Sequence, residues 1–260
     1  MLQVVLTVSA CKRLIAKGIV RHPEIQRAIN AHTIVIVAGT TNGYIAEEIL
    51  KYLGYEDPFP KNRFFRGITL PPFYPLTDMG RLPDESTFPG DVVIVKGNWE
   101  RGKNLFDVAQ QLAQSDVILK GANALDMNNR RAGIFVAHPQ GGTIGVTIPA
   151  VIGRRVKLII PVGLEKRISG NLDTIALKIN SAHGNGPRFF PVPGEVFTEI
   201  DAIKILTGAD VELIGGGGVN GAEGALWFAI SGTEEQEYHA NELVQEIQNE
   251  PPFQIIKLNS

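Results

Sequence analysis

The chain has 260 residues, of which 44% are hydrophobic and 20% are charged, so it can bury a sizeable core in one large or two modest domains. Its formal net charge of −2 gives no electrostatic case for nucleic acid or an anionic membrane as a partner, because both need clustered Lys and Arg. The single cysteine, Cys11, excludes an internal disulfide framework and a cysteine-ligated zinc site.

The N-terminal part of the chain predicts helices and no targeting segment. No apolar run reaches the roughly 18–20 residues of a membrane span, and we therefore expect a cytoplasmic protein without a membrane partner. Residues 8–32 have helical spacing, with Pro23 opening a second short helix. Cys11 fits a buried position in the first helix better than a lone nucleophile.

A candidate ligand loop follows the first buried strand. Residues 33–38 are rich in β-branched side chains, the loop Gly39-Thr40-Thr41-Asn42-Gly43 comes next, and residues 44–53 return to helical spacing. This order makes an anion cradle, because the first N–H groups of a helix lack partners within it and carry the positive end of its dipole. The alternative is that Thr40 or Thr41 only caps the helix.

Residues 55–89 form a long excursion rich in proline, with an edge strand expected at residues 65–70. Its aromatic residues argue against disorder, and we expect a packed loop over the site or at a subunit contact. The aromatic side chains in question are Phe64, Phe65, Phe73 and Tyr74. They either stack on an adenine or cover an acyl chain of the ligand, or they form a local mini-core that pins the loop.

Strands and helices then alternate as far as residue 162. Strands are expected at residues 91–97, 117–120, 134–137 and 156–162, and helices at residues 105–114 and about 143–155. This alternation predicts an α/β fold over residues 1–180, with a mostly parallel sheet in a three-layer α/β/α arrangement. Polar residues gather where the strands end, which is the edge at which open parallel sheets bind ligands.

The C-terminal part predicts a smaller ferredoxin-like α+β domain over residues 186–260. The expected order is strand 188–191, helix 197–207, strands 211–214 and 225–231, helix 233–248 and strand 253–258. Thr233 and Gln236 fit a capping box, and the four glycines at 215–218 fit a bulge better than a cofactor loop. An open sheet face carrying Leu213, Trp227 and Phe228 predicts a homo-oligomer.

Three motifs together resemble the superfamily of ribose-5-phosphate isomerase, glucosamine-6-phosphate deaminase, the CoA transferases, the sugar-sensing domains of some repressors and the regulatory subunits of initiation factor 2B. The motifs are Ala38-Gly-Thr-Thr-Asn-Gly43, Lys120-Gly-Ala-Asn123, and Gly141-Gly-Thr-Ile-Gly145 before the strand at 156–161. The resemblance covers roughly residues 28–165. It implies a phosphorylated or CoA-linked small molecule as the partner.

The resemblance also implies roles for single residues. Gly39, Thr40, Thr41, Asn42 and Gly43 map onto the family's phosphate loop, and Gly121-Ala122-Asn123 maps onto its acidic motif. Asn123 is a departure, because an amide cannot act as a general base. Asp126 is an alternative carboxylate, and Glu165 matches the CoA-transferase nucleophile by position only. Gly141, Gly142 and Thr143 complete the expected ligand-binding set.

Each charged candidate has a second interpretation. Lys96 and Lys120 end two strands and suit an anionic substrate or are simply solvated. Arg130 and Arg131 clamp a phosphate or coat a loop, and Asp126 is catalytic or only a turn residue. The five histidines have no metal-ligand spacing, so neither a metal site nor a cofactor is expected.

Three functions remain open from the sequence. The first is an enzyme that acts on a sugar phosphate or acyl-CoA, with Asp126, Lys120 or Glu165 as catalytic groups. The second is a metabolite sensor of the same fold, which Asn123 favours, although no output module is visible. The third, a nicotinamide-dependent enzyme, lacks a Gly-x-Gly-x-x-Gly turn between strand and helix.

Overall fold

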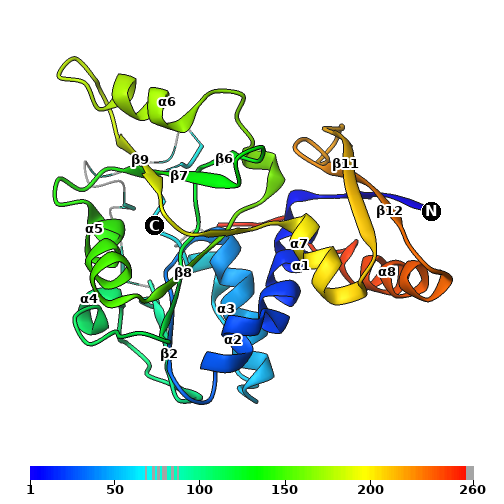
Figure 1. Cartoon of the computed structure of the whole chain (residues 1–260), viewed down its shortest axis with the longest axis horizontal. Helices are drawn as coiled ribbons and strands as arrows, with labels where there is room; N and C mark the ends of the chain where they lie inside the picture. The colour runs from blue at the N-terminus through cyan, green and yellow to red at the C-terminus, as the bar shows by residue number, and fades with distance from the viewer. Residues whose placement is uncertain are drawn as a thin grey trace.

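The computed structural model describes residues 1–67, 69–71, 74, 77, 81–82, 85–86 and 88–255. A six-stranded sheet forms the centre of the molecule, in the order β10-β8-β5-β2-β3-β4 (Figure 1). Its strands are β2 (Thr33–Ile36), β3 (Val92–Val95), β4 (Asn98–Trp99), β5 (Val117–Leu119), β8 (Lys157–Pro161) and β10 (Glu195–Phe197). The first three pairings from the β10 edge are parallel, whereas β3 runs antiparallel to β2 and β4 antiparallel to β3. The predicted α/β class with a mostly parallel sheet is confirmed.

Helices lie on both sides of β2 and β8 in Figure 1. On one side are α1 (Val8–Arg21), α2 (Pro23–Ala28) and α3 (Thr40–Tyr52), and on the other are α4 (Leu105–Val108) and α5 (Gly142–Ile148). A π-helical turn, η2 (Pro149–Gly153), continues α5. The β-branched residues of β2, β3, β5 and β8 are almost all buried, which explains why these strands do not alternate with polar residues.

A second sheet of three strands has the order β6-β7-β9. It is antiparallel and consists of β6 (Ala124–Asp126), β7 (Arg131–Val136) and β9 (Arg188–Val192). Helix α6 (Leu172–Ile179) packs against this sheet, and the two share a small separate core of Ala124, Leu172 and Phe189. Gly133 allows the close approach of β9, because a Cβ there would lie 2.1 Å from Phe189 Cζ.

The third sheet joins the N-terminal and C-terminal parts of the chain in the order β1-β12-β11. It contains β1 (Leu2–Leu6), β11 (Asp210–Gly216) and β12 (Leu226–Ser231), with α7 (Glu199–Thr207) and α8 (Glu234–Ile247) nearby. The ferredoxin-like unit expected for residues 188–258 is not confirmed, because β9 pairs with β7 and β10 pairs with β8. Residues 251–255 form no strand, and the rest of the expected last strand lies outside the described residues.

Two local predictions for this sheet are confirmed. A register shift between Leu213 and Gly215 gives the bulge expected at the glycine run. The capping box of Thr233 and Gln236 opens α8.

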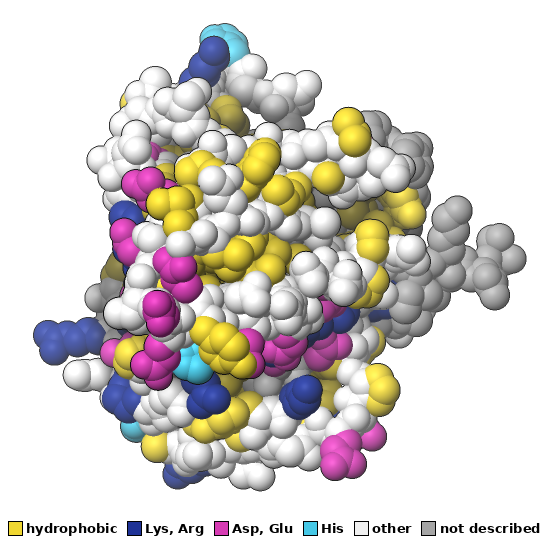
Figure 2. Space-filling model, turned by 90° about the vertical axis from the view of Figure 1, so that its right-hand side faces the viewer, with side chains coloured by type: hydrophobic (Ala, Val, Ile, Leu, Met, Phe, Trp, Pro, Cys, Tyr) yellow, Lys and Arg dark blue, Asp and Glu magenta, His cyan; other side chains and the backbone are white. Residues whose placement is uncertain are grey.

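The predicted apolar sheet face was partly wrong. Phe228 is fully buried while Trp227 is 45% exposed, because neighbouring strand residues point to opposite faces. Trp227, Val5 and Ile214 are exposed apolar side chains on the strands of this sheet. Hydrophobic side chains gather on the corresponding face of the molecule in Figure 2. A homo-oligomer stays a prediction.

The loop after α3 is pinned by aromatic contacts. Phe59 packs on Phe64 at 5.1 Å and on Trp99 at 6.1 Å between ring centroids. Phe65 packs on Phe253 at 6.0 Å, so the mini-core interpretation fits these residues. Phe73 lies outside the described residues, and the described part of residues 65–70 contains no strand. The 3-10 turn η1 (Lys61–Arg63) lies within this loop, and a second 3-10 turn, η3 (Leu164–Lys166), follows β8.

No described helix is long and apolar enough to span a membrane.

Candidate functional site

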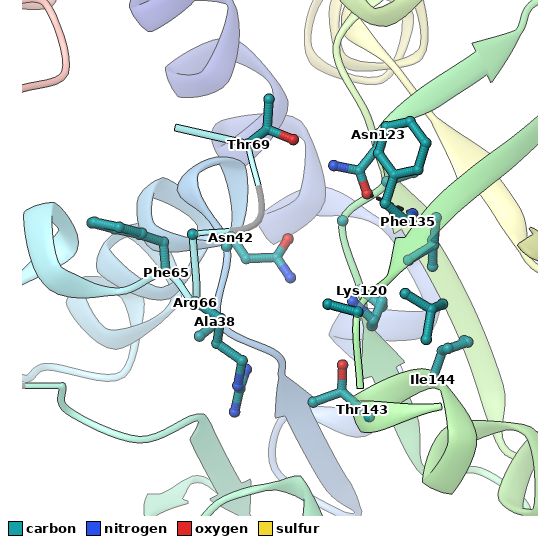
Figure 3. A pocket seen from close by; sticks show the side chains of 18 of the residues that line it. Ala38, Asn42, Phe65, Arg66, Thr69, Lys120, Asn123, Phe135, Thr143 and Ile144 are labelled. Atoms are coloured by element: carbon teal, nitrogen blue, oxygen red, sulfur yellow. Dashed lines mark hydrogen bonds between the residues drawn. The ribbon is translucent and has the colours of Figure 1, made fainter. Parts of the chain in front are cut away.

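A cavity of ≈460 Å³ opens at the edge of the central sheet where β2 and β5 end (Figure 3). Because these strands are parallel, the turns that follow them meet at the same edge. The wall opposite is built by β7 and the start of α5, and residues from the loop after α3 complete the rim. The lining includes most of the predicted ligand-binding residues: Gly39, Thr40, Thr41, Asn42, Lys120, Gly121, Asn123, Gly141, Gly142 and Thr143.

The N-terminus of α3 faces the cavity without a side-chain cap. Gly39 is the N-cap residue and has no capping hydrogen bond, so the alternative role of Thr40 or Thr41 as a cap is not observed. Asn42 is fully buried, and its Nδ2 donates to the carbonyls of Val37 and Leu119 at 2.7 and 3.0 Å. This bridges the ends of β2 and β5.

Two buried polar atoms at this turn have no hydrogen-bond partner among the described residues: Thr41 Oγ1 and Asn42 Oδ1. A buried group without a partner costs free energy, about 1–3 kcal/mol in protein mutational data. The Thr41 hydroxyl can donate to an anion, whereas Asn42 Oδ1 can only accept. Together they suit a ligand that carries an anionic group and a hydroxyl.

Gly43, the last residue of the predicted ligand loop, does not line the cavity. A Cβ at Gly43 would meet Lys61 instead.

Four basic side chains line the cavity: Arg66, Arg81, Lys120 and Lys166. Arg81 forms a 2.9 Å ion pair with Glu85. Arg66 forms a 2.9 Å ion pair with Asp91 and lies over the Phe88 ring, and its Nε has no described partner. Lys166 donates to the carbonyl of Ala122 at 3.0 Å. The side-chain amine of Lys120 has neither a hydrogen bond nor an ion pair among the described residues, while its backbone N–H donates to the carbonyl of Ile159. Burial first, and then the neighbouring Arg66 and Lys166, lower the pKa of Lys120 to about 8, although Asp91 opposes the shift.

Asp91 holds this side of the cavity together and was not predicted. Its buried carboxylate accepts from Ala38 N at 2.8 Å and from Leu105 N at 2.9 Å, besides pairing with Arg66. It fixes the turn after β2, the start of α4 and one cation. The sequence signal was an acidic residue directly before a buried strand. Placing Asp91 at the cavity also requires the direction of that strand, β3, which is antiparallel to β2.

Four predicted charged residues lie away from the cavity. Lys96 follows β3, and because β3 is antiparallel, that end lies at the opposite edge of the sheet. Asp126 is a turn residue that accepts from Asn129 N at 3.1 Å and Asn129 Nδ2 at 2.8 Å, and these bonds lower its pKa. Arg130 pairs with Asp201 at 2.9 Å, and Arg131 pairs with Asp173 at 2.7 Å.

Glu165 lies beside Lys166 but does not line the cavity. It raises the pKa of Glu199, a fully buried carboxyl that accepts from Leu164 N at 3.0 Å. Burial is the larger cause, and the pKa of Glu199 rises to about 8. Burial also raises the pKa of the Cys11 thiol well above its usual range, which disfavours the nucleophilic thiolate.

The remaining wall is shaped by hydrogen bonds within the protein. Asn123 Oδ1 accepts from Phe135 N at 3.0 Å, while its amide nitrogen faces the cavity in Figure 3. His138 Nδ1 accepts from Gln140 N at 3.1 Å. Across the described residues, no group of His, Cys, Asp and Glu is arranged to hold a metal ion.

The arrangement combines an uncapped helix terminus with four basic side chains in a single cavity, and one of the four, Lys120, has a lowered pKa. These groups can bind an anion and exchange a proton or attack an electrophile. No model of a known protein family matches the chain, and no curated protein matches it either.

Proposed function

We propose that the chain is an enzyme that binds a small phosphorylated metabolite in this cavity. The observation that carries the proposal is the meeting of the uncapped α3 terminus, with its unpartnered Thr41 hydroxyl, and the cations Arg66, Lys120 and Lys166. Anions are stabilised both by free helix N–H groups and by nearby positive charge. Asn42 Oδ1 adds an acceptor for a ligand hydroxyl, which a sugar phosphate supplies.

Lys120 favours an enzyme over the alternative of a sensor. A binding site needs only charge, but an amine whose pKa is about 8 is partly neutral at physiological pH and can act as base or nucleophile. Asn123 still leaves the sensor as the second candidate, since the carboxylate of the related isomerases is replaced there by an amide.

The CoA and nicotinamide alternatives have less support. Phe65 lines the cavity, but it is only 7% exposed and packs on Phe253, so it offers little ring surface to an adenine. The turn after β2 has no Gly-x-Gly-x-x-Gly pattern. Distant membership of the ribose-5-phosphate isomerase superfamily is part of the proposal. A three-layer arrangement and a cytoplasmic location belong to it as well.

Gly39 offers a matched pair of variants to test anion binding. A Cβ at Gly39 meets no heavy atom within 4 Å, and its φ of 177° suits any residue. Asp and Asn are both good N-cap residues, so Gly39→Asp and Gly39→Asn should fold alike. Only Gly39→Asp adds a charge that repels an anion. Thermal unfolding of each protein with and without inorganic phosphate measures the difference.

Phosphate should stabilise the wild type, by about 1.4 kcal/mol at ten times its dissociation constant. The stabilisation should vanish in Gly39→Asp and survive at least in part in Gly39→Asn. Equal stabilisation of both variants would place the anion elsewhere and refute the proposed site. Incubation with ribose 5-phosphate and other sugar phosphates, followed by NMR, then separates enzyme from sensor. A sensor binds them and forms no product.

A further inference from the structure

We propose that Lys120 forms a covalent imine with the carbonyl carbon of its substrate, which makes the substrate a phosphorylated aldehyde or ketone. The inference rests on the proposed function, since the anion site would hold the phosphate end of that molecule. The geometry that carries it is the cavity that Lys120 lines together with Arg66 and Lys166, two cations that other groups hold in place.

The two neighbouring cations are held in place by other groups. Asp91 and the Phe88 ring fix Arg66, and the carbonyl of Ala122 fixes Lys166. Neither cation can therefore relieve the repulsion by simple withdrawal. No described carboxylate pairs with Lys120 to favour its ammonium form, because Asp91 is already ion-paired with Arg66 and accepts from two backbone N–H groups. The neutral amine, which is the nucleophilic form, is therefore more populated at neutral pH than in an ordinary lysine.

The surroundings of Lys120 also suit condensation. Part of the opposite wall is apolar and consists of Ile134, Val136 and Ile144. Asn42 approaches from the end of β2, where a phosphate or hydroxyl would bind. A carbonyl carbon between these groups would lie within the same cavity as the amine (Figure 3).

The step balances without any further reactant. The amine nitrogen adds to the carbonyl carbon, and a proton moves from nitrogen to oxygen to give a carbinolamine. The C–O bond then breaks and a C=N bond forms. Both hydrogens of the neutral amine leave with the carbonyl oxygen as water. Hydrolysis of the imine reverses the same bonds and frees Lys120.

Reductive trapping on the full chain tests the inference. The protein is incubated with glyceraldehyde 3-phosphate and sodium cyanoborohydride, and labelled lysines are identified by peptide mass spectrometry. We expect one label, at Lys120, at least about tenfold faster than at Lys96, which also ends a strand but lies at the opposite edge. Inorganic phosphate should slow the label at Lys120 and leave Lys96 unchanged. Lys120→Met should lose the fast label, but mapping of the wild type does not depend on that variant folding.

The outcomes separate the inference from the proposed function. Labelling no faster at Lys120 than at Lys96, in a protein that phosphate still stabilises, would overturn the imine and leave the anion site standing. Fast labelling of Lys120 by unphosphorylated glyceraldehyde, in a protein that phosphate does not stabilise, would support the imine and overturn phosphate binding. Failure of both measurements would overturn both proposals.

Discussion

The carboxyl group of Glu199 has no exposed surface, and its protonation makes the stability of the fold depend on pH. Burial and the nearby Glu165 raise its pKa from 4.5 to about 8. Between these values the folded chain holds a proton that the unfolded chain releases. Its contribution to stability is therefore fully present below pH 4.5 and is lost as pH rises toward 8.

Glu199→Gln should remove this dependence, because an amide does not ionise. We expect the melting temperature of Glu199→Gln, relative to that of the wild type, to increase as pH rises from 5 to 8.5. Calorimetry or circular dichroism across that range measures the increase. Glu212→Gln serves as the control because Glu212 is exposed on β11. A parallel pH dependence for Glu199→Gln and the wild type would contradict the assignment.

At the residue scale, the candidate site was predictable where side chains follow parallel strands. Thr41, Asn42, Lys120 and Asn123 line the cavity as expected, because the ends of β2 and β5 meet. Lys96 was placed wrongly and Asp91 was missed for one shared reason. Both depend on the antiparallel direction of β3, which a local pattern of hydrophobic residues does not contain.

At the element scale, the packing of α1 on α7 depends on a close approach at Gly18. A Cβ there would lie 2.7 Å from Ala202 Cβ and 3.0 Å from Phe197 Cζ. Alanine is favoured over glycine in a helix by about 1 kcal/mol, but overpacking typically costs about 1–3 kcal/mol. Gly18→Ala should therefore lower the free energy of unfolding, as measured by urea denaturation.

A second substitution checks the mechanism. Ala202→Gly removes the methyl group that Gly18→Ala meets, so the double variant should be more stable than the sum of the two single changes predicts. The recovery is limited by two contacts that remain, at 2.8 Å with the Cα of residue 202 and at 3.0 Å with Phe197 Cζ. Strict additivity would show that the two helices adjust without strain.

Most elements were predictable from sequence, whereas their partners were not. Runs of β-branched residues predicted β2, β3, β5 and β8. The strand β1 and the short strands β4, β6 and β10 were not predicted. The predicted ferredoxin-like unit is not found, because its strands pair with other partners than expected. Strand β1 (Leu2–Leu6) takes the position beside β12, and β9 pairs with β7. Such pairings join segments far apart in sequence, which alternation alone does not specify.

At the scale of the whole molecule, one buried cation ties distant segments together. Arg13 on α1 donates to Glu250 at 2.8 Å, to Glu48 at 2.7 Å and to Glu47, and it lies over the Tyr44 ring. Lys61 also pairs with Glu47 and Glu250, at 3.0 and 3.2 Å. The cluster joins α1, α3, η1 and the C-terminal segment. Phe253 N donates to Ser9 Oγ at 3.1 Å and adds a second attachment.

Arg13→Met keeps much of the side-chain volume and removes the charge. It leaves three carboxylates around the single cation Lys61, so we expect a loss of about 3–5 kcal/mol of stability at pH 7, measured by urea denaturation. Arg27→Met is the control, since the contacts of Arg27 are exposed: an ion pair with Glu24 and a long 3.5 Å hydrogen bond to the carbonyl of Ser115. This variant should cost no more than about 1 kcal/mol.

The deficit of Arg13→Met should also depend on pH. Burial alone would raise the pKa of Glu250, but the hydrogen bonds and positive charges of Arg13 and Lys61 together outweigh burial and lower it, with Arg13 as the larger contributor of the two. A lowered carboxyl pKa stabilises the fold above the ordinary value of 4.5, and this contribution is lost as pH falls through the folded value. The gap between wild type and Arg13→Met should therefore be full at pH 7 and narrow below pH 4.5. A gap that stays constant with pH would mean that lost packing of the Arg13 side chain over Tyr44, rather than its charge, accounts for the cost.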